Sequence, residues 1–463
     1  MRTRARPTLI AAAAVTACLA VVATVVVVTR PAGPAPVDSR QVRAAITPEG
    51  VARHLEALQE IADRHRGNRA AGTSGYEASL AYVEGQLAGA GYRTRRQQFS
   101  YERPDFTRAS LRRTAPVATA YTVLRDFGPL AFSGTGAVTA PVRAVDLHLE
   151  GDRATTSGCD VSDFTEFRRG DIALVQRGTC PFGDKVERAA SAGASAVVVL
   201  NQGDDPSRLG LFAGTLGRQV SVPVLATTFD LGRAWAEPGT VLELAVEATV
   251  ARVVTENLLA DTASGASAHT VVLGAHLDGV AEGPGINDNG SGTAAVLEIA
   301  VRFAELGIQP RNRVRFAFWG AEEDGLYGSR YYVSQLDDAA RRETAVYLNL
   351  DMVGSPKGVA SVYGGGDPGS GWPAGSGDAQ SVLTDFLTSQ GVRPGTVTFR
   401  SSDHASFLDA GIPAGGLFTG ADGGEDPCYH QACDRSATIN RGLLGLMADA
   451  AADATLTFAQ AAR

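Results

Sequence analysis

The sequence predicts an α/β protein with a largely parallel central sheet and a smaller α+β domain inserted into it. Residues 46–92 carry apolar side chains near a 3.6-residue period, as amphipathic helices do. Residues from about 110 to 250 contain short β-rich runs with one clear helix. From about residue 255, apolar runs of strand length alternate with helical segments, a pattern typical of parallel sheets.

The N-terminal segment predicts export. Residues 1–7 are basic, and the apolar, uncharged run TLIAAAAVTACLAVVATVVVV follows, so residues 1–30 are typical of a secretory signal peptide or an uncleaved signal anchor. Arginines precede the run, which predicts that the rest of the chain lies outside the membrane. Residues 31–45 are interpreted as a linker. We therefore expect a protein that is secreted or anchored at the outer face of the cell membrane.

Length and charge restrict the class of protein further. The chain has 463 residues, too many for one compact core, so two domains or more are expected. Its formal net charge of −8, without a basic stripe, argues against nucleic acid as a partner.

The cysteines predict two disulfides. Cys18 lies in the leader, and the other four form two local pairs, Cys159 with Cys180 and Cys428 with Cys433. An even number of cysteines in an exported chain favours disulfides. A zinc–thiolate site is the alternative, but neither pair has the CxxC spacing that such sites use.

Histidine and carboxylates follow three consecutive predicted strands. His276 and Asp278 end the first, Glu322 and Glu323 follow the second, and Asp351 follows the third. Ligands of α/β sheets bind beyond the carboxyl ends of the strands, so these side chains are expected at one edge of the sheet.

Further candidate residues lie in loops. Asp288 belongs to a glycine-rich turn that brings it back toward the first strand end. Tyr429 and His430 lie within CYHQACD, where a disulfide would hold them rigidly. Asp403 and His404 form another candidate pair, with a surface or supporting position as the alternative.

This set of side chains predicts a metal site. Imidazole with carboxylates suits Zn²⁺ or a similar divalent ion, and this many carboxylates favour two ions about 3.5–4 Å apart. Of the adjacent Glu322 and Glu323, one could bind metal while the other accepts a proton from the attacking water. Acidic residues also cluster at solvated loop ends, but a set at three strand ends favours a metal site.

The chain resembles the secreted two-zinc aminopeptidases, the aminopeptidase Y and bacterial aminopeptidase S group of clan MH. The resemblance rests on GAHLDGV, GINDNGSGTAAVLE, RFAFWGAEEDGLYGS, YLNLDMVGS, SDHASF, GIPAGGLFTGA and CYHQACD, together with GNRAAGTSGYEAS near Gly67. RRGDIALVQRGTCPFGDKVERAASAGASAVVVLN resembles a protease-associated (PA) domain. The resemblance implies a three-layer zinc-peptidase domain with a central mixed, largely parallel sheet. This catalytic domain would comprise residues 46–115 and 251–463, with the PA domain inserted at 116–250.

The resemblance also implies the metal ligands. It assigns His276 and Asp351 to one zinc ion and Glu323 and His430 to the other, with Asp288 bridging both. Two Zn²⁺ ions per chain are thus the expected cofactors.

The remaining roles are carried over in the same way. Asp278 would orient His276, as metal-bound histidines usually require. Glu322 would be the general base, and Tyr429 would donate to the developing oxyanion. Glu322 and Asp351 would also help to bind the free α-amino group, and Phe418 would line the pocket for the first side chain.

The expected function is hydrolysis of the N-terminal peptide bond of peptides with a free N-terminus and an apolar first residue. A hydroxide bridging two zinc ions would be the nucleophile, and the protein is expected to be a monomer. A carboxypeptidase or deacylase of the same fold is the first alternative. An inactive receptor or binding ectodomain is the second, but such a protein would be expected to lose ligands or the base, and none is missing here. For the PA domain, a structural spacer and a gate for long substrates remain open.

Overall fold

The structure is a computed structural model that describes residues 39–366, 369, 371–421 and 424–462. The predicted leader, residues 1–30, and the first part of the predicted linker lie outside the described residues. The linker interpretation does not hold for residues 39–45, because Ser39–Ala45 form helix α1 and its Val42 is fully buried. Within the described ranges, no helix is long and apolar enough to cross a bilayer.

The main sheet is mixed and largely parallel, as predicted. Its strand order is β13-β12-β14-β11-β9-β10-β8. Strands β14, β11, β9 and β10 pair in parallel, whereas β8 is antiparallel to β10 and β12 is antiparallel to β14. The strands are β8 (Val241–Asp261), β9 (Ala266–His276), β10 (Asn312–Trp319), β11 (Thr344–Leu350), β12 (Ser361–Tyr363), β13 (Gly395–Val397) and β14 (Ala414–Phe418).

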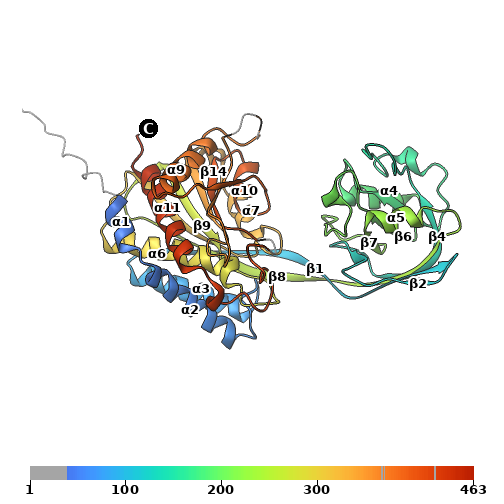
Figure 1. Cartoon of the computed structure of the whole chain (residues 1–463), viewed down its shortest axis with the longest axis horizontal. Coiled ribbons are helices and arrows are strands. Elements are labelled where there is room, and N and C mark those ends of the chain that lie inside the picture. The colour runs from blue at the N-terminus through green and yellow to red at the C-terminus, as the bar shows by residue number, and fades with distance from the viewer. Residues whose placement is uncertain (1–38, 367–368, 370, 422–423, 463) are drawn as a thin grey trace, which may run out of the picture. The chain divides into compact units, whose positions relative to one another are not determined.

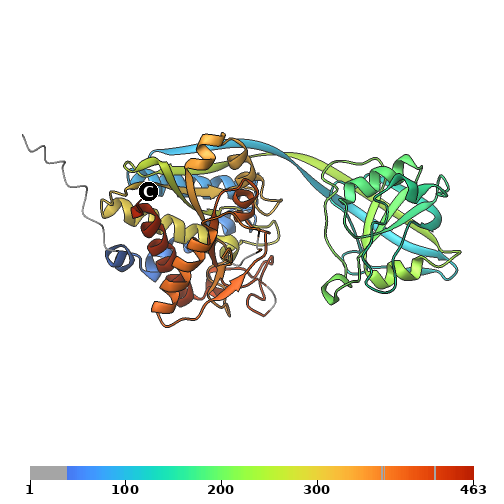
Figure 2. The same ribbon diagram turned by 90° about the horizontal axis from the view of Figure 1, so that it is seen from above.

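Helices cover both faces of this sheet and complete three layers (Figures 1 and 2). Helices α6 (Gly292–Glu305) and α11 (Arg441–Gln460) pack on one face, and α7 (Tyr327–Ser334) and α10 (His404–Asp409) pack on the other. The central strands are therefore buried on both faces where helices cover them: residues 270–276 of β9 are all buried, and most of them are apolar. The other helices of this part are α1 (Ser39–Ala45), α2 (Pro48–Arg64), α3 (Ser74–Gly89), α8 (Asp338–Glu343) and α9 (Ser376–Ser389).

The inserted domain is α+β, as predicted, and it shares two strands with the main sheet. Strand β1 (Thr94–Ala115) pairs antiparallel with β8 along nearly its whole length. One end of β8 pairs with β10, whereas its other end pairs with β4. The insert also contains β2 (Thr119–Ala120), β3 (Phe127–Pro129), β4 (Gly136–Ala144), β5 (Ile172–Gln176), β6 (Ala196–Leu200), β7 (Val224–Thr227), α4 (Phe182–Ser191) and α5 (Phe229–Trp235).

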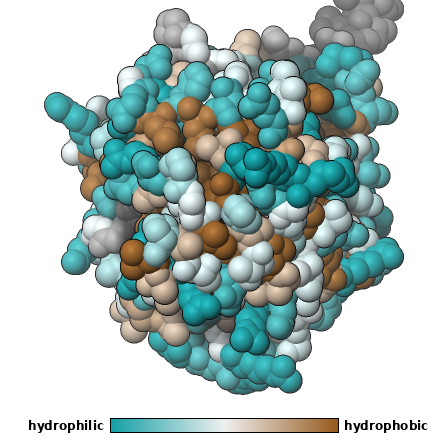
Figure 3. Space-filling model, turned by 90° about the vertical axis from the view of Figure 1, so that its right-hand side faces the viewer, coloured by the Kyte–Doolittle hydropathy of each residue, from teal (hydrophilic) through white to brown (hydrophobic). Residues whose placement is uncertain are grey.

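The inserted domain has its own hydrophobic core. Strands β4, β5, β6 and β7 pair in parallel, and the central ones are buried on both faces. Trp235 of α5 and Val186 of α4 are fully buried in two clusters that fill this core. On the surface in Figure 3, apolar groups alternate with polar ones, as is usual for a face in contact with water.

Candidate active site

Three neighbouring parallel strands deliver the predicted side chains to one edge of the main sheet. Strand β9 ends at His276, β10 at Trp319 and β11 at Leu350. Asp278, Glu322, Glu323 and Asp351 follow these ends directly, and His276, Asp278, Glu322 and Asp351 are buried.

The side chains form two linked groups. Nε2 of His276 lies 3.3 Å from Oδ1 of Asp288 and 3.3 Å from Oδ1 of Asp351. Nε2 of His430 lies 3.1 Å from Oδ2 of Asp288 and 3.1 Å from Oε2 of Glu323. Asp288 therefore stands between the two histidines and faces each with a different oxygen.

These residues fit a divalent metal. Ligand atoms of His276, Asp288 and Glu323 lie within 4.8 Å of one another, as do those of His276, Glu322 and Asp351. Oε1 of Glu323 is buried and has no hydrogen-bond partner. Imidazole nitrogens and carboxylate oxygens are the donor set of zinc sites. The set in this protein is therefore suited to zinc.

Electrostatics support the same conclusion. Burial raises the pKa of Glu322 well above its usual range, and the neighbouring Glu323 and Asp351 carboxylates raise it further. Burial likewise raises the pKa of Glu323 to about 8, with a further contribution from Asp288. Buried carboxylates that repel one another retain protons unless a cation neutralises them.

Asp278 positions the glutamate pair through the backbone. Its Oδ1 accepts a hydrogen bond from the Glu322 N–H at 3.2 Å, and its Oδ2 accepts one from the Glu323 N–H at 3.3 Å. Nδ1 of His276 lies 3.2 Å from the Asp278 backbone oxygen and 3.8 Å from its carboxylate. The imidazole thus contacts Asp278 mainly through the main chain, and the carboxylate is used to hold the turn after β10.

The loop that carries Asp288 is held by two residues to which the sequence analysis assigned no role. The Arg69 guanidinium is fully buried and donates to the carbonyl oxygens of Leu277, Pro284 and Gly285, with 2.9 Å for Pro284. Asp434 accepts from the N–H of Asn287 at 2.7 Å and of Asp288 at 3.0 Å. Both residues lie inside motifs that carry the family resemblance, which is the signal that could have identified them.

Ser402 is a third such residue, and it lies next to the candidate pair Asp403 and His404. Its hydroxyl donates to Oδ2 of Asp351 at 2.6 Å. His404 is fully buried, and its Nε2 lies 2.8 Å from the Phe399 backbone oxygen. Burial lowers the pKa of His404 to about 4. Asp403 is also fully buried, so neither member of the pair lies on the surface.

A disulfide brackets the loop with Tyr429 and His430. Cys428 and Cys433 are bonded, and the rings of Tyr429 and His430 stack with centroids 3.8 Å apart. The metal-site residues open into a cavity of about 620 Å³, and its wall also contains Leu326, Met352, Phe399, Phe418 and Tyr429. The cavity therefore joins an acidic site to a partly apolar wall.

The comparisons with known proteins identify the family. Residues 257–455 match the model of "Peptidase family M28", and residues 138–235 match "PA domain". An aminopeptidase of Pseudomonas aeruginosa strain UCBPP-PA14 is 42% identical over 429 residues, covering 88% of this chain and 80% of the relative. This chain belongs to peptidase family M28. The predicted family, fold and enzyme class are thus confirmed.

Two other proteins extend the comparison. The "Probable lipoprotein aminopeptidase LpqL" of Mycobacterium tuberculosis strain H37Rv is 37% identical over 456 residues, covering 90% of this chain and 86% of that protein. The structure of an aminopeptidase from Aneurinibacillus sp. strain AM-1 matches with a TM-score of 0.75 at 25% identity, covering 92% of this chain and 97% of that one. The similarity to these two proteins therefore extends over both parts of this chain, whereas the M28 model itself matches residues 257–455.

Proposed function

We propose that this M28 peptidase is a two-zinc aminopeptidase that removes the N-terminal residue from peptides. The observation that carries the proposal is the position of Asp288, whose two oxygens face His276 at 3.3 Å and His430 at 3.1 Å. A carboxylate placed in this way suits a bridge between two ions. His276 and Asp351 would complete one ion's ligands, and Glu323 and His430 the other's.

The reaction follows from the positions of the neighbouring residues. Zinc bound here would lower the pKa of a water and polarise the scissile carbonyl. Glu322 borders the same cavity, and its raised pKa suits a group that accepts the water proton and returns it to the leaving amine. The Tyr429 hydroxyl would donate to the oxygen on which negative charge develops.

We propose that the carboxylates and the apolar side chains of the cavity wall recognise different parts of the substrate. Carboxylates of Glu322 and Asp351 suit the cationic α-amino group of a free N-terminus. Phe418 lines the same cavity beside Phe399, at a ring-centroid distance of 5.0 Å, which supports an apolar first side chain.

We also propose that the enzyme works outside the cytoplasm, either secreted or anchored through residues 1–30, and that it acts as a monomer. Both disulfides are formed, which suits an oxidising compartment. The M. tuberculosis relative is named a probable lipoprotein aminopeptidase, which supports the anchored form of this proposal.

The test is an assay of purified protein on a panel of aminoacyl-p-nitroanilides, each with a free or an acetylated N-terminus. Cleavage of the free forms alone, abolished by a chelator and restored by zinc, is the expected result. Inactivity on every free-amine substrate by a protein that holds zinc would overturn the aminopeptidase proposal. Carboxypeptidase and deacylase substrates would then be assayed.

A further inference from the structure

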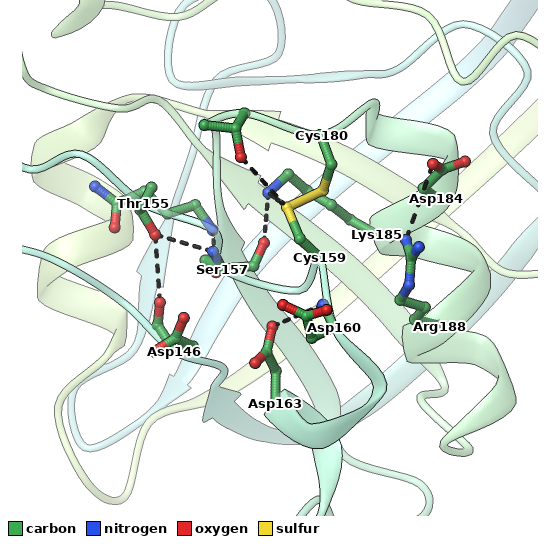
Figure 4. Close-up of a disulfide and its surroundings, with 12 residues drawn as sticks. Asp146, Thr155, Ser157, Cys159, Asp160, Asp163, Cys180, Asp184, Lys185 and Arg188 are labelled. Carbon is green, nitrogen blue, oxygen red and sulfur yellow. Dashed lines mark hydrogen bonds and ion pairs between the residues drawn. A yellow bond between two sulfur atoms is a disulfide. The ribbon is translucent and has the colours of Figure 1, made fainter.

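A fully buried lysine lies against the disulfide of the inserted domain (Figure 4). Lys185 belongs to α4, which begins directly after Cys180 and Pro181. Its ammonium group donates to the Ser157 carbonyl oxygen and lies 3.6 Å from Sγ of Cys159. The Cys159–Cys180 bond thus has a cation next to one of its two sulfurs.

Within the described ranges, this ammonium group forms no ion pair. Asp163 and Asp146 attract the ammonium group from beyond ion-pair distance, Asp163 accepts from the Asp160 N–H at 3.1 Å, and Asp184 pairs with Arg188 at 4.0 Å. A buried charge without a counterion is costly. A disulfide sulfur is neutral, but a thiolate at Cys159 would supply the missing negative charge.

A neighbouring ammonium group stabilises a thiolate and lowers the pKa of its thiol. In thiol–disulfide exchange, the sulfur that forms the more stable thiolate is the better leaving group. We propose that Cys180 is a site of mixed-disulfide formation with low-molecular-mass thiols, and that Cys159 is the leaving sulfur, stabilised by Lys185. Cys159 and Cys180 are both partly exposed, which suits access by a small thiol.

The exchange proceeds in two steps. The thiolate of the small thiol attacks Sγ of Cys180 and forms a new S–S bond. The Cys159–Cys180 bond breaks, and its electron pair leaves on Cys159 as a thiolate beside the Lys185 ammonium group. A second small thiol then attacks the mixed disulfide, releases Cys180 as a thiolate and leaves as the small-molecule disulfide, which completes a two-electron reduction.

The first test uses the unmodified enzyme with reduced glutathione as the probe. After brief incubation the sample is quenched with acid, free thiols are alkylated with a maleimide, and the peptides are identified by mass spectrometry. Glutathione on Cys180 with maleimide on Cys159 is the expected pattern. Glutathione mainly on Cys159, or equally on both, would overturn the proposal.

The second test compares the wild type with Lys185→Met, and the Cys428–Cys433 bond of the same chain serves as the internal reference. Reduction of Cys159–Cys180 by glutathione is expected to slow by about tenfold in the variant, because the leaving thiolate loses its cation. The rate for Cys428–Cys433 should not change. An unchanged or faster rate at Cys159–Cys180 would contradict the proposal. Should the variant fail to fold, the position of the glutathione adduct in the wild type decides alone.

Discussion

Ser402 donates a hydrogen bond of 2.6 Å to Oδ2 of Asp351, while the other oxygen of that carboxylate faces Nε2 of His276 at 3.3 Å. Ser402 in turn accepts from the Asn349 side chain at 2.8 Å, and Asn349 accepts from the Tyr347 hydroxyl at 2.6 Å. All of these groups are buried. The chain of hydrogen bonds fixes which oxygen of Asp351 is available to a metal.

Ser402→Ala should weaken zinc binding by about 10–100-fold, since supporting hydrogen bonds of this kind tune metal ligands. The measurement is competition for zinc against a chelator of known affinity. The exposed Ser334→Ala on α7 is a matched control and should leave the affinity unchanged. Equal zinc affinity in Ser402→Ala and wild type would contradict the positioning role.

Glu322→Gln and Glu323→Gln should separate proton transfer from metal binding. Removing the base should lower kcat/KM by about 10²–10⁴-fold, with zinc content retained. Glu323→Gln removes a carboxylate that lies 3.1 Å from His430, so zinc content itself should fall. Zinc analysis and kinetics on both proteins are the measurements. A Glu322→Gln protein with near wild-type kcat/KM would exclude Glu322 as the base.

Arg69→Met should destabilise the fold and the loop before Asp288. The substitution removes the Arg69 donor from the buried carbonyl oxygens of Leu277 and Pro284, and one of two donors from that of Gly285, which also accepts from the Gly290 N–H at 3.0 Å. A loss of about 3 kcal/mol in the free energy of unfolding is therefore expected. Arg64→Met on the nearby helix α2 removes an exposed arginine that pairs with Glu60 at 2.8 Å, and should cost about 0.5 kcal/mol or less. Denaturant unfolding of both variants measures the difference. Equal midpoints and slopes would refute this account of Arg69.

The Cys428–Cys433 bond should matter for the site more than for global stability. It closes a loop with a sequence separation of only 5, so its effect on the unfolded chain is small. Replacing both cysteines with serine frees the segment of His430, and activity should fall at limiting zinc and recover with excess zinc. The double variant Cys159→Ser/Cys180→Ser should keep its activity. A double variant at 428 and 433 with unchanged zinc dependence would show that the bracket is not needed.

Zinc affinity should rise with pH. Burial works to lower the pKa of His430, but hydrogen bonds to Asp288 and Glu323 outweigh it and raise that pKa to about 10. His430 of the metal-free protein is therefore protonated at neutral pH, and zinc must displace that proton. Each displaced proton makes the affinity rise by about tenfold per pH unit until its pKa is reached.

The same shift affects the stability of the metal-free protein. Because the folded-state pKa of His430 is raised, its contribution is complete below the ordinary histidine pKa and is lost as pH rises toward about 10. The pH dependence of zinc affinity is tested by calorimetry of zinc binding in buffers of different ionisation enthalpy, which counts the protons that zinc releases. A count unchanged in His430→Gln would show that His430 holds no proton there.

Much of the site could be predicted because its residues follow local patterns. The apolar runs before His276, Glu322 and Asp351 identify three strands, and parallel strands present their carboxyl ends at one edge. Arg69 and Ser402 could not be assigned roles in this way. Their partners are backbone carbonyls and one oxygen of Asp351, and local periodicity does not indicate which distant atom a buried donor will meet.

The sequence by itself determined the alternation of strands and helices, the inserted domain and the donor types of the site, because these depend on local periodicity and residue chemistry. Only the tertiary structure decided that Asp288 presents a different oxygen to each of His276 and His430, that Arg69 holds the loop before Asp288, and that Lys185 lies against Cys159. Each of those contacts joins two segments that are separated along the chain. They exist only after the layers have packed, when buried charges and hydrogen-bond donors must find partners.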